Sequence, residues 1–320
     1  RCLSDWSSDV CSSDLLAVPR IVQVSVGNEH ACALDDSGTA FCWGSQANGQ
    51  IGTRQNTDPL DPMNYSLCRD DYLGSVSACK EYPFEVKGLT HQLHSISAGG
   101  YYSCATSDTG TLYCWGANDF GQIGAYPNTY GTPSSGPQDI SQTTAEMAIV
   151  VTGLRHTCAL STAGAVYCWG DNSYFQLGAG TEADCQSSPS SPHFSCSWNP
   201  LLVPGLERDA VEITAGDFHS CARKRDNRIV CWGLNDSGQL GDGTTSGGSP
   251  REIDLRPFAG KTVRKIDAGG AATCAVTVDG ALYCWGDTYM NVGNVADAAK
   301  RCTRDGKSVF CHKTPEKIYD

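Results

Sequence analysis

One motif occurs five times along this chain of 320 residues. Each copy has a glycine, four residues, a Cys-Ala pair and, ten residues after that cysteine, the triplet Cys-Trp-Gly. The copies occupy residues 24–52, 96–124, 150–178, 213–241 and 266–293. A repeat of this size cannot bury a core alone and must stack on its neighbours. The sequence therefore predicts a repeat architecture built from small, similar units.

Each copy is predicted to form a β-hairpin. A turn residue lies midway between its two cysteines: Gly38, Gly110, Gly164, Asn227 or Gly280. Glycine, and next best asparagine, adopts the left-handed backbone that a hairpin turn needs. The two cysteines then face each other across antiparallel strands, within disulfide range. The predicted pairs are Cys32 with Cys42, Cys104 with Cys114, Cys158 with Cys168, Cys221 with Cys231, and Cys274 with Cys284.

Cysteine usage points to an oxidising compartment. The chain has 18 cysteines, and their spacing repeats with the motif. Because the cytosol keeps thiols reduced, we expect an extracellular or cell-surface location, although no signal peptide is visible. Residues 1–15 resemble translated sequencing-adapter read-through. They are excluded as an artefact, together with Cys2 and Cys11.

Charge and hydropathy disfavour two classes of partner. The formal net charge is −12, and the sequence has no long run of Lys and Arg and no basic tail. Nucleic-acid binding normally requires such a basic patch, so we expect no nucleic-acid partner. No apolar run approaches the roughly 18 residues of a membrane-spanning helix, so we expect no membrane insertion.

The segments between the copies add a further strand. A proline followed three residues later by a hydrophobic residue precedes most copies, and the same pattern recurs after the last one. These prolines are Pro83, Pro137, Pro200, Pro250 and Pro315. Each unit then has about four short strands, which is the composition of one propeller blade.

The combined pattern resembles a known family. Ala-Gly, Cys-Ala, Cys-Trp-Gly and Gly-Gln-Leu-Gly follow one another in residues 215–241, and this order resembles the regulator of chromosome condensation repeat family. The resemblance covers about residues 20–320. It implies an all-β fold, a β-propeller of four-stranded blades, with residues 16–320 as a single domain. The cysteine pairs resemble those of secreted bacterial members.

Family members typically form seven blades, whereas this chain has five recognisable copies. We expect a gene fragment that starts and ends inside a blade and so forms an incomplete ring. The alternative is a closed five-bladed ring, in which the strand at residues 315–318 pairs into the first blade. Without closure, the terminal strands would be exposed edges.

Three long connectors are candidate binding loops. Residues 53–82, 179–199 and 294–314 each contain a further cysteine pair. We expect local pairing of Cys68 with Cys79, Cys185 with Cys196, and Cys302 with Cys311, although sequence alone does not determine connectivity. Aromatic residues in loops suit protein interfaces, but they equally suit packing of each loop on its own blade. The candidates are Tyr65 and Tyr72 in the first connector, Phe194 and Trp198 in the second, and Tyr126 and Tyr130 in the loop that follows the second copy.

No motif indicates catalysis. The recurring His30, His156 and His219 fit a structural hydrogen-bonding role better than a metal site, and we expect no metal or cofactor. The predicted function is therefore a non-catalytic scaffold that binds another protein or a surface glycan. The family's eukaryotic namesake is a guanine nucleotide exchange factor for a small GTPase, so exchange activity is the first alternative. A propeller lectin or hydrolase-associated domain is the second.

Overall fold

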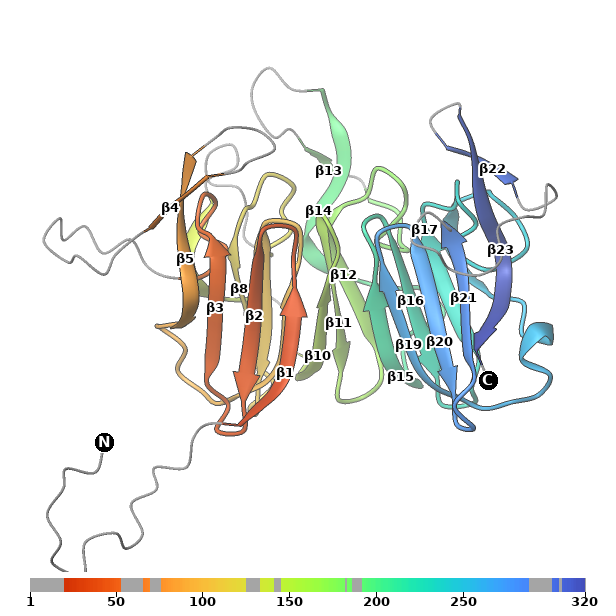
Figure 1. The fold of residues 1–320 in the computed structure, drawn as a ribbon, viewed down its shortest axis with the longest axis horizontal. Coiled ribbons are helices and arrows are strands. Elements are labelled where there is room, and N and C mark those ends of the chain that lie inside the picture. Colours follow the sequence, from red (N-terminus) through yellow and green to blue (C-terminus); the bar gives the residue numbers. More distant parts are fainter. Residues whose placement is uncertain are drawn as a thin grey trace, which may run out of the picture.

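Five antiparallel sheets follow one another along the chain in the computed structural model (Figure 1). The structure describes residues 20–52, 66–69, 76–124, 133–140, 145–181, 183–185, 192–287, 301–304 and 307–319. Each sheet is one blade, and the strands within a blade are hydrogen-bonded in chain order, apart from an extra hairpin strand in three of them. The predicted all-β propeller architecture is confirmed.

The three odd-numbered blades have five strands each. Blade 1 contains β1 (Ile21–Val26), β2 (His30–Asp35), β3 (Ala40–Ser45), β5 (Val76–Glu85) and β4 (Ser66–Arg69). Blade 3 contains β10 (Met147–Thr152), β11 (His156–Ser161), β12 (Val166–Asp171), β14 (Phe194–Leu202) and β13 (Ala183–Cys185). Blade 5 contains β19 (Val263–Gly269), β20 (Ala272–Thr277), β21 (Leu282–Asp287), β23 (Lys307–Tyr319) and β22 (Arg301–Arg304).

The two even-numbered blades have four strands each. Blade 2 contains β6 (Leu93–Ala98), β7 (Tyr102–Ser107), β8 (Leu112–Gly116) and β9 (Ser134–Asp139). Blade 4 contains β15 (Ala210–Ala215), β16 (His219–Lys224), β17 (Ile229–Gly233) and β18 (Gly248–Glu252). A single turn of 3₁₀ helix, η1 (Arg256–Phe258), precedes blade 5. No helix in the described part of the chain is long and apolar enough to cross a membrane.

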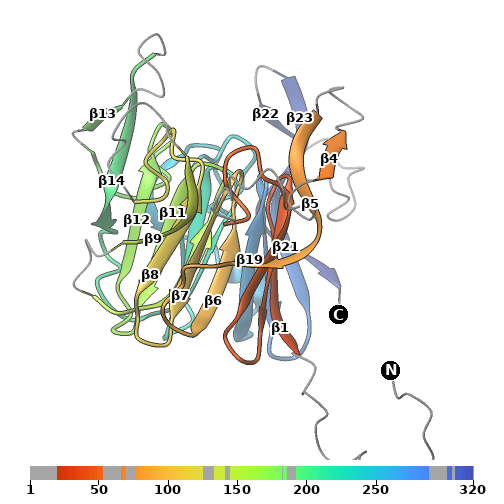
Figure 2. The same ribbon diagram turned by 90° about the vertical axis from the view of Figure 1, so that its left-hand side faces the viewer.

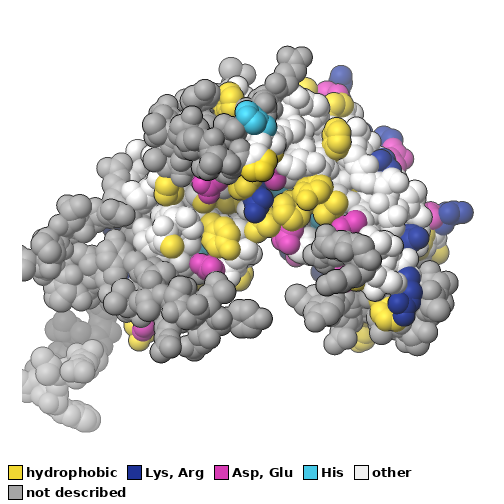
Figure 3. Space-filling view, turned by 90° about the horizontal axis from the view of Figure 1, so that it is seen from above, with side chains coloured by type: hydrophobic (Ala, Val, Ile, Leu, Met, Phe, Trp, Pro, Cys, Tyr) yellow, Lys and Arg dark blue, Asp and Glu magenta, His cyan; other side chains and the backbone are white. Residues whose placement is uncertain are grey.

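The first strands of the blades line a central cavity. β1 packs beside β6, β6 beside β10, β10 beside β15, and β15 beside β19. Residues from all five of these strands enclose a volume of about 610 Å³. Seen from above, the five blades form an arc rather than a closed ring (Figure 3).

The register of the hairpins follows the prediction. Cys158 lies directly opposite Cys168, and the other four copies repeat this pairing. The turn glycines have positive φ, for example 86° at Gly164, and Asn227 adopts the same conformation with φ 70°. Local residue choice therefore accounts for the hairpin of every blade.

The proline-containing strands do not begin the blade that follows them. Pro83 lies in β5, which pairs with β3 of the preceding copy, and Pro315 lies in β23, which pairs with β21. These strands lie outside the hairpin of their own blade, away from the cavity, where a residue without an N–H is tolerated. The closed five-bladed alternative is wrong, because the strand that contains residues 315–318 pairs with β21 of blade 5 and not with blade 1.

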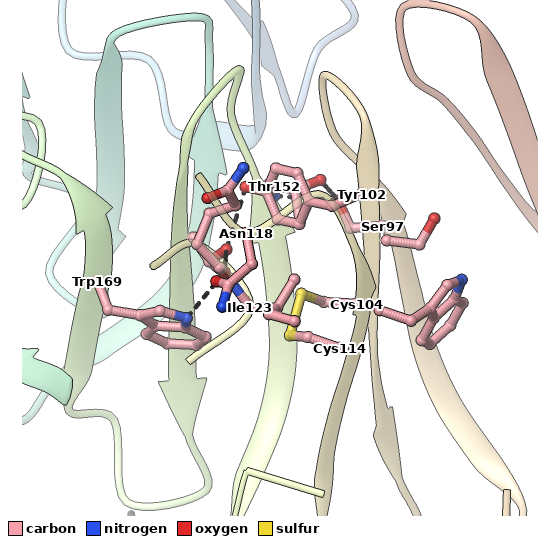
Figure 4. The surroundings of a disulfide bond; sticks show 12 residues. Ser97, Tyr102, Cys104, Cys114, Asn118, Ile123, Thr152 and Trp169 are labelled. Atoms are coloured by element: carbon pink, nitrogen blue, oxygen red, sulfur yellow. Dashed lines mark hydrogen bonds between the residues drawn. A yellow bond between two sulfur atoms is a disulfide. The ribbon is translucent and has the colours of Figure 1, made fainter. Parts of the chain in front are cut away.

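Tryptophan and disulfide point to opposite faces of each blade. In blade 2, Cys104 and Cys114 pack with Trp169 of blade 3, while Trp115 packs with Cys32 and Cys42 of blade 1. Figure 4 shows the Cys104–Cys114 disulfide with Trp169 to one side of it. Trp115 and Trp169 are fully buried. Each interface between blades is thus a layer of one indole ring against one disulfide.

A hydrogen bond from each indole adds to this layer. Trp169 Nε1–H donates to the backbone carbonyl of Gln122 in the preceding blade, at 3.0 Å (Figure 4). Trp115, Trp232 and Trp285 repeat this contact at 2.9 Å. The side-chain oxygen of Gln122 accepts a hydrogen bond from the N–H of Phe120 at 2.8 Å. Gln122 therefore stabilises the turn of its own loop through its side chain and bonds to the neighbouring blade through its backbone carbonyl.

Three hairpins rise above one face of the propeller, called here the upper face. They are β4–β5, β13–β14 and β22–β23, on blades 1, 3 and 5 (Figures 1 and 2). The upper face also carries the loops that follow β1, β3 and their equivalents. The opposite, lower face carries the cysteine hairpin turns. The described parts of the three long connectors predicted from sequence therefore all project on one side.

Candidate functional site

The cysteines predicted to pair are brought together in every case that the structure describes completely. The sulfurs of Cys158 and Cys168 are bonded, with Cα atoms 4.1 Å apart, and the other four hairpin pairs are alike. Cys185 is joined to Cys196, and Cys302 to Cys311. Cys79 is disulfide-bonded, whereas the side chain of Cys68 lies outside the described residues. The oxidation state of the isolated protein stays a prediction.

Two of the six predicted aromatic candidates can be placed. Phe194 on β14 lies with its ring centroid 4.8 Å from that of Phe120 in blade 2. Trp198, also on β14, packs against Gly121, where an added Cβ would come within 3.2 Å of the Trp198 Cβ. Phe194 and Trp198 thus both contact the adjacent blade 2. The other four, Tyr65, Tyr72, Tyr126 and Tyr130, lie outside the described residues.

An aromatic surface crosses blades 2, 3 and 4 on the upper face. Most of its residues lie at two recurring positions of the repeat. One is the residue directly before the second strand of a blade. The other lies two residues before the recurring glutamine in the loop after the third strand. Contacts join the positions across blades, because Arg155 lies 4.3 Å from the Phe120 ring centroid and Tyr174 lies 5.2 Å from that of Phe218. The upper aromatic surface comprises Tyr101, Phe120, Tyr174, Phe175, Phe194 and Phe218. Figure 3 shows hydrophobic side chains gathered near the middle of this face.

Phe175 occupies a position that is glycine in three other blades. Its φ is 63°, close to the values of 79°, 76° and 77° at Gly49, Gly121 and Gly238. A left-handed backbone costs a residue with a side chain on the order of 1–2 kcal/mol. The side chain recovers little of this by burial, because Phe175 is 52% exposed and the adjacent Tyr174 is 45% exposed. Strain of this kind is characteristic of functional positions.

Carboxylates lie among these aromatic residues. Burial raises the pKa of Asp171, although hydrogen bonds from Ser173 and the charge of Arg155 act in the opposite direction. Burial also raises the pKa of Asp119, again opposed by Arg155. Arg155 therefore lies between two acidic groups and above an aromatic ring, in a compact cluster at the boundary of blades 2 and 3.

The recurring histidines connect blades below this surface. Their Nε2 atoms lie 2.8 Å from hydroxyl oxygens of the next blade, in the pairs His30–Ser103, His156–Ser220 and His219–Thr273. The Ser103 hydroxyl donates to the Gln50 carbonyl at 2.9 Å, so His30 Nε2–H must donate to Ser103. The imidazole is then neutral, with Nδ1 unprotonated and buried without a partner in the described structure. This arrangement agrees with the structural role expected from sequence.

Burial keeps these imidazoles neutral. It lowers the pKa of His30 to about 4, of His156 to about 3 and of His219 to about 4. In blade 2, Tyr102 takes the histidine position, and its hydroxyl donates to the carbonyl of His156. Residues at this position of the repeat therefore connect neighbouring blades. The upper aromatic surface remains the candidate site.

Most residues of the upper aromatic surface escaped sequence reasoning. Phe194 is the one sequence-predicted candidate that belongs to this surface, because the prediction rested on aromatic residues in the loops between the copies. A signal was present, however. Aligning the five copies places Phe120 and Tyr174 opposite Asn48 and Ser237, and Phe175 opposite glycine. An aromatic residue at an exposed position where the other copies have a different kind of residue marks this surface, since the stacking of blades does not require an aromatic residue there.

Known proteins resemble the chain over most of its length. Residues 7–319 match the family described as RCC1-like domain. A curated relative is the mitochondrial RCC1 domain-containing protein RUG3 of Arabidopsis thaliana, 28% identical over 82% of this chain and 53% of its own length. The ultraviolet-B receptor UVR8 of the same plant is 28% identical over 87% and 56%. The secretion-regulating guanine nucleotide exchange factor of Bos taurus is 25% identical over 93% and 57%. The chain thus spans just over half the length of these relatives.

Solved structures show the same fold. Human WBSCR16 superposes with a TM-score of 0.72 at 19% identity, covering 94% of this chain and 67% of that protein. Yeast RCC1 (Prp20), in its complex with Kap60, superposes with a TM-score of 0.71 at 21% identity, covering 93% and 63%. With five blades built from the repeat and a family match over almost the whole sequence, the chain belongs to the RCC1-like domain family of β-propellers.

Proposed function

We propose that this chain is a protein-binding propeller without catalytic activity of its own, and that the upper aromatic surface holds its partner. The observation that carries the proposal is Phe175. A bulky residue is kept in a left-handed conformation, half exposed, where glycine would suffice for the turn. Exposed aromatic residues on a rigid scaffold are the usual anchors of protein interfaces. Relatives include a protein named as an exchange factor and ligases, which act on other proteins.

The repeat itself supplies a test variant that should fold. Phe120→Asn, Tyr174→Ser and Phe175→Gly replace each residue by the one that another blade carries at the same position. We expect the triple variant to lose at least ~10-fold in partner capture, because several interface anchors are removed together. The measurement is quantitative mass spectrometry of proteins retained by the immobilised propeller from medium and cell-surface extract of the source organism.

A matched control lies on the lower face. Val278 is 66% exposed next to the hairpin turn of blade 5, and Val278→Thr removes a similar kind of exposed apolar contact there. This variant should retain the same proteins as the unaltered chain. Equal retention by the triple variant would exclude the upper aromatic surface as the binding site.

We also propose an extracellular or cell-surface location. The five hairpin cysteine pairs and the connector pairs support it, because such a disulfide content is uncommon in the cytosol. Protein isolated from its native source, alkylated without reductant, is expected to show no modified cysteine in the hairpin pairs by intact-mass analysis. Because these cysteines are buried, the alkylation is done in denaturant, and peptide mapping that finds alkylated Cys158 or Cys168 would contradict this location.

A further inference from the structure

The inner loops of the upper face carry an excess of negative charge. In the described loops around the upper end of the cavity, the acidic residues are Glu29, Asp119, Asp171, Asp217, Asp236, Asp242 and Asp287, and Asp242 is paired with Arg251 of β18. The same loops contain one cation, Arg155. This cation already lies over the Phe120 ring and beside Asp119 and Asp171. These loops therefore carry net negative charge beside the exposed aromatic residues.

Acidic and aromatic residues alternate on this surface. Asp119 precedes Phe120, and Asp217 precedes Phe218. Asp236 accepts hydrogen bonds from Ser237 and Gln239, neighbours within its own loop, rather than from a described Lys or Arg. A cation that approaches these loops meets both a carboxylate and the face or edge of a ring, which are the two groups that attract it.

The lower face has a different charge arrangement. In blades 4 and 5, cations and carboxylates of this face are paired: Arg228 contacts Asp226 at 2.7 Å, and Lys261 contacts Asp279 at 2.8 Å. The hairpin turns of blades 4 and 5 therefore present mixed, paired charge. The described upper inner loops instead combine exposed aromatic rings with predominantly negative charge, and opposite charge across an interface governs partner selection and association rate.

We propose that the upper aromatic surface recognises a positively charged segment of its partner, with Lys or Arg side chains placed between the carboxylates and the aromatic rings. This inference rests on the proposed function and adds the chemistry of the partner. The left-handed backbone at Phe175 then has a functional explanation, because this conformation keeps an aromatic ring exposed among the acidic loops. The existing Arg155–Phe120 contact is the internal example of the same interaction.

The experiment uses a display library of short random peptides. Peptides are selected on the whole chain and counter-selected on the triple variant Phe120→Asn, Tyr174→Ser, Phe175→Gly. We expect the enriched peptides to be rich in Lys and Arg, with clear net positive charge. Their affinity, measured by fluorescence anisotropy, should fall at least ~10-fold between low and high salt, because exposed charges are screened.

Charge-neutral variants separate electrostatics from shape. Asp217→Asn with Asp236→Asn should lower the affinity for the enriched peptides at least ~5-fold. The control, Asp36→Asn with Asp108→Asn on the lower hairpins, changes the net charge equally and should leave this affinity unchanged. Enrichment of neutral or acidic peptides, salt-independent binding, or no enrichment over the triple variant would each overturn the inference. If the triple variant still loses its natural partners in those cases, the proposed function stands and only the positively charged partner is excluded.

Discussion

Replacement of all five hairpin cysteine pairs by alanine is expected to leave the chain without cooperative folding. Each disulfide closes a hairpin with a sequence separation of 10 residues. In the chain-entropy description, a loop of that size contributes on the order of 3 kcal/mol by restricting the unfolded state. Five such loops together equal or exceed the ~5–15 kcal/mol by which domains are normally stable. Circular dichroism and urea titration would measure the loss.

Packing adds to this effect. The sulfurs of Cys104, Cys158 and Cys221 are fully buried between blades, so their removal also leaves cavities beside the tryptophan layer. A single pair replacement, Cys158→Ala with Cys168→Ala, is therefore expected to lower the free energy of unfolding by at least ~3 kcal/mol. An unchanged urea midpoint in this variant would contradict the structural role of the pair.

The connector disulfide of blade 3 provides the control. Cys185 and Cys196 have a sequence separation of 11, almost the same loop length. β13 pairs only with β14, however, so this hairpin can open without separating two blades. Cys185→Ala with Cys196→Ala should consequently affect the main unfolding transition less than the Cys158 and Cys168 pair does. The comparison distinguishes loop closure from adhesion between blades.

Acidification is expected to destabilise the propeller between about pH 6.5 and pH 4. The folded state holds His30, His156 and His219 neutral, with pKa values lowered to about 4, 3 and 4 by burial. In the unfolded chain their pKa is about 6.5, so the unfolded state binds more protons in this window. Stability is therefore fully present above pH 6.5 and falls as the pH approaches 4. Each histidine contributes on the order of 3 kcal/mol.

The slope of stability with pH is the quantity to measure. Urea unfolding at pH 7.5 and at intermediate acid values gives the free energy of unfolding directly. Glutamine at positions 30, 156 and 219 retains a donor in place of Nε2 but cannot titrate, so His30→Gln, His156→Gln and His219→Gln together should flatten the curve. His91→Gln with His94→Gln, at exposed positions, should leave it unchanged. A wild-type curve that is already flat from pH 7.5 to 4.5 would contradict the prediction.

Two carboxyl groups act in the opposite sense. Burial raises the pKa values of Asp119 and Asp171, so the folded state binds protons there more readily than the unfolded state does. Their contribution to stability increases as the pH falls through the raised values. They lie at the upper face and offset part of the histidine effect, so Asp171→Asn should make the acid destabilisation steeper.

Several elements of the fold were predictable because they depend on nearby residues. The cysteine register requires only a turn at the right place, which Gly164 and Asn227 each provide. Strand pairing of the proline segments was not predictable in this way. Pro83 lies between two copies, and nothing local distinguishes pairing with the hairpin before it from pairing with the strand after it. Only the hydrogen bonds between β5 and β3 in the folded chain show that Pro83 belongs to the blade of the preceding hairpin.

The sequence by itself determined the number of units, the hairpin of each unit and the facing cysteines, because short-range geometry and turn chemistry suffice for them. Only the tertiary structure decided how blades adhere and where a partner would bind. The indole of Trp169 meets the Gln122 carbonyl, and Arg155 meets the Phe120 ring, across blade boundaries. Such contacts join residues that are distant along the chain, so they exist only once the blades have stacked.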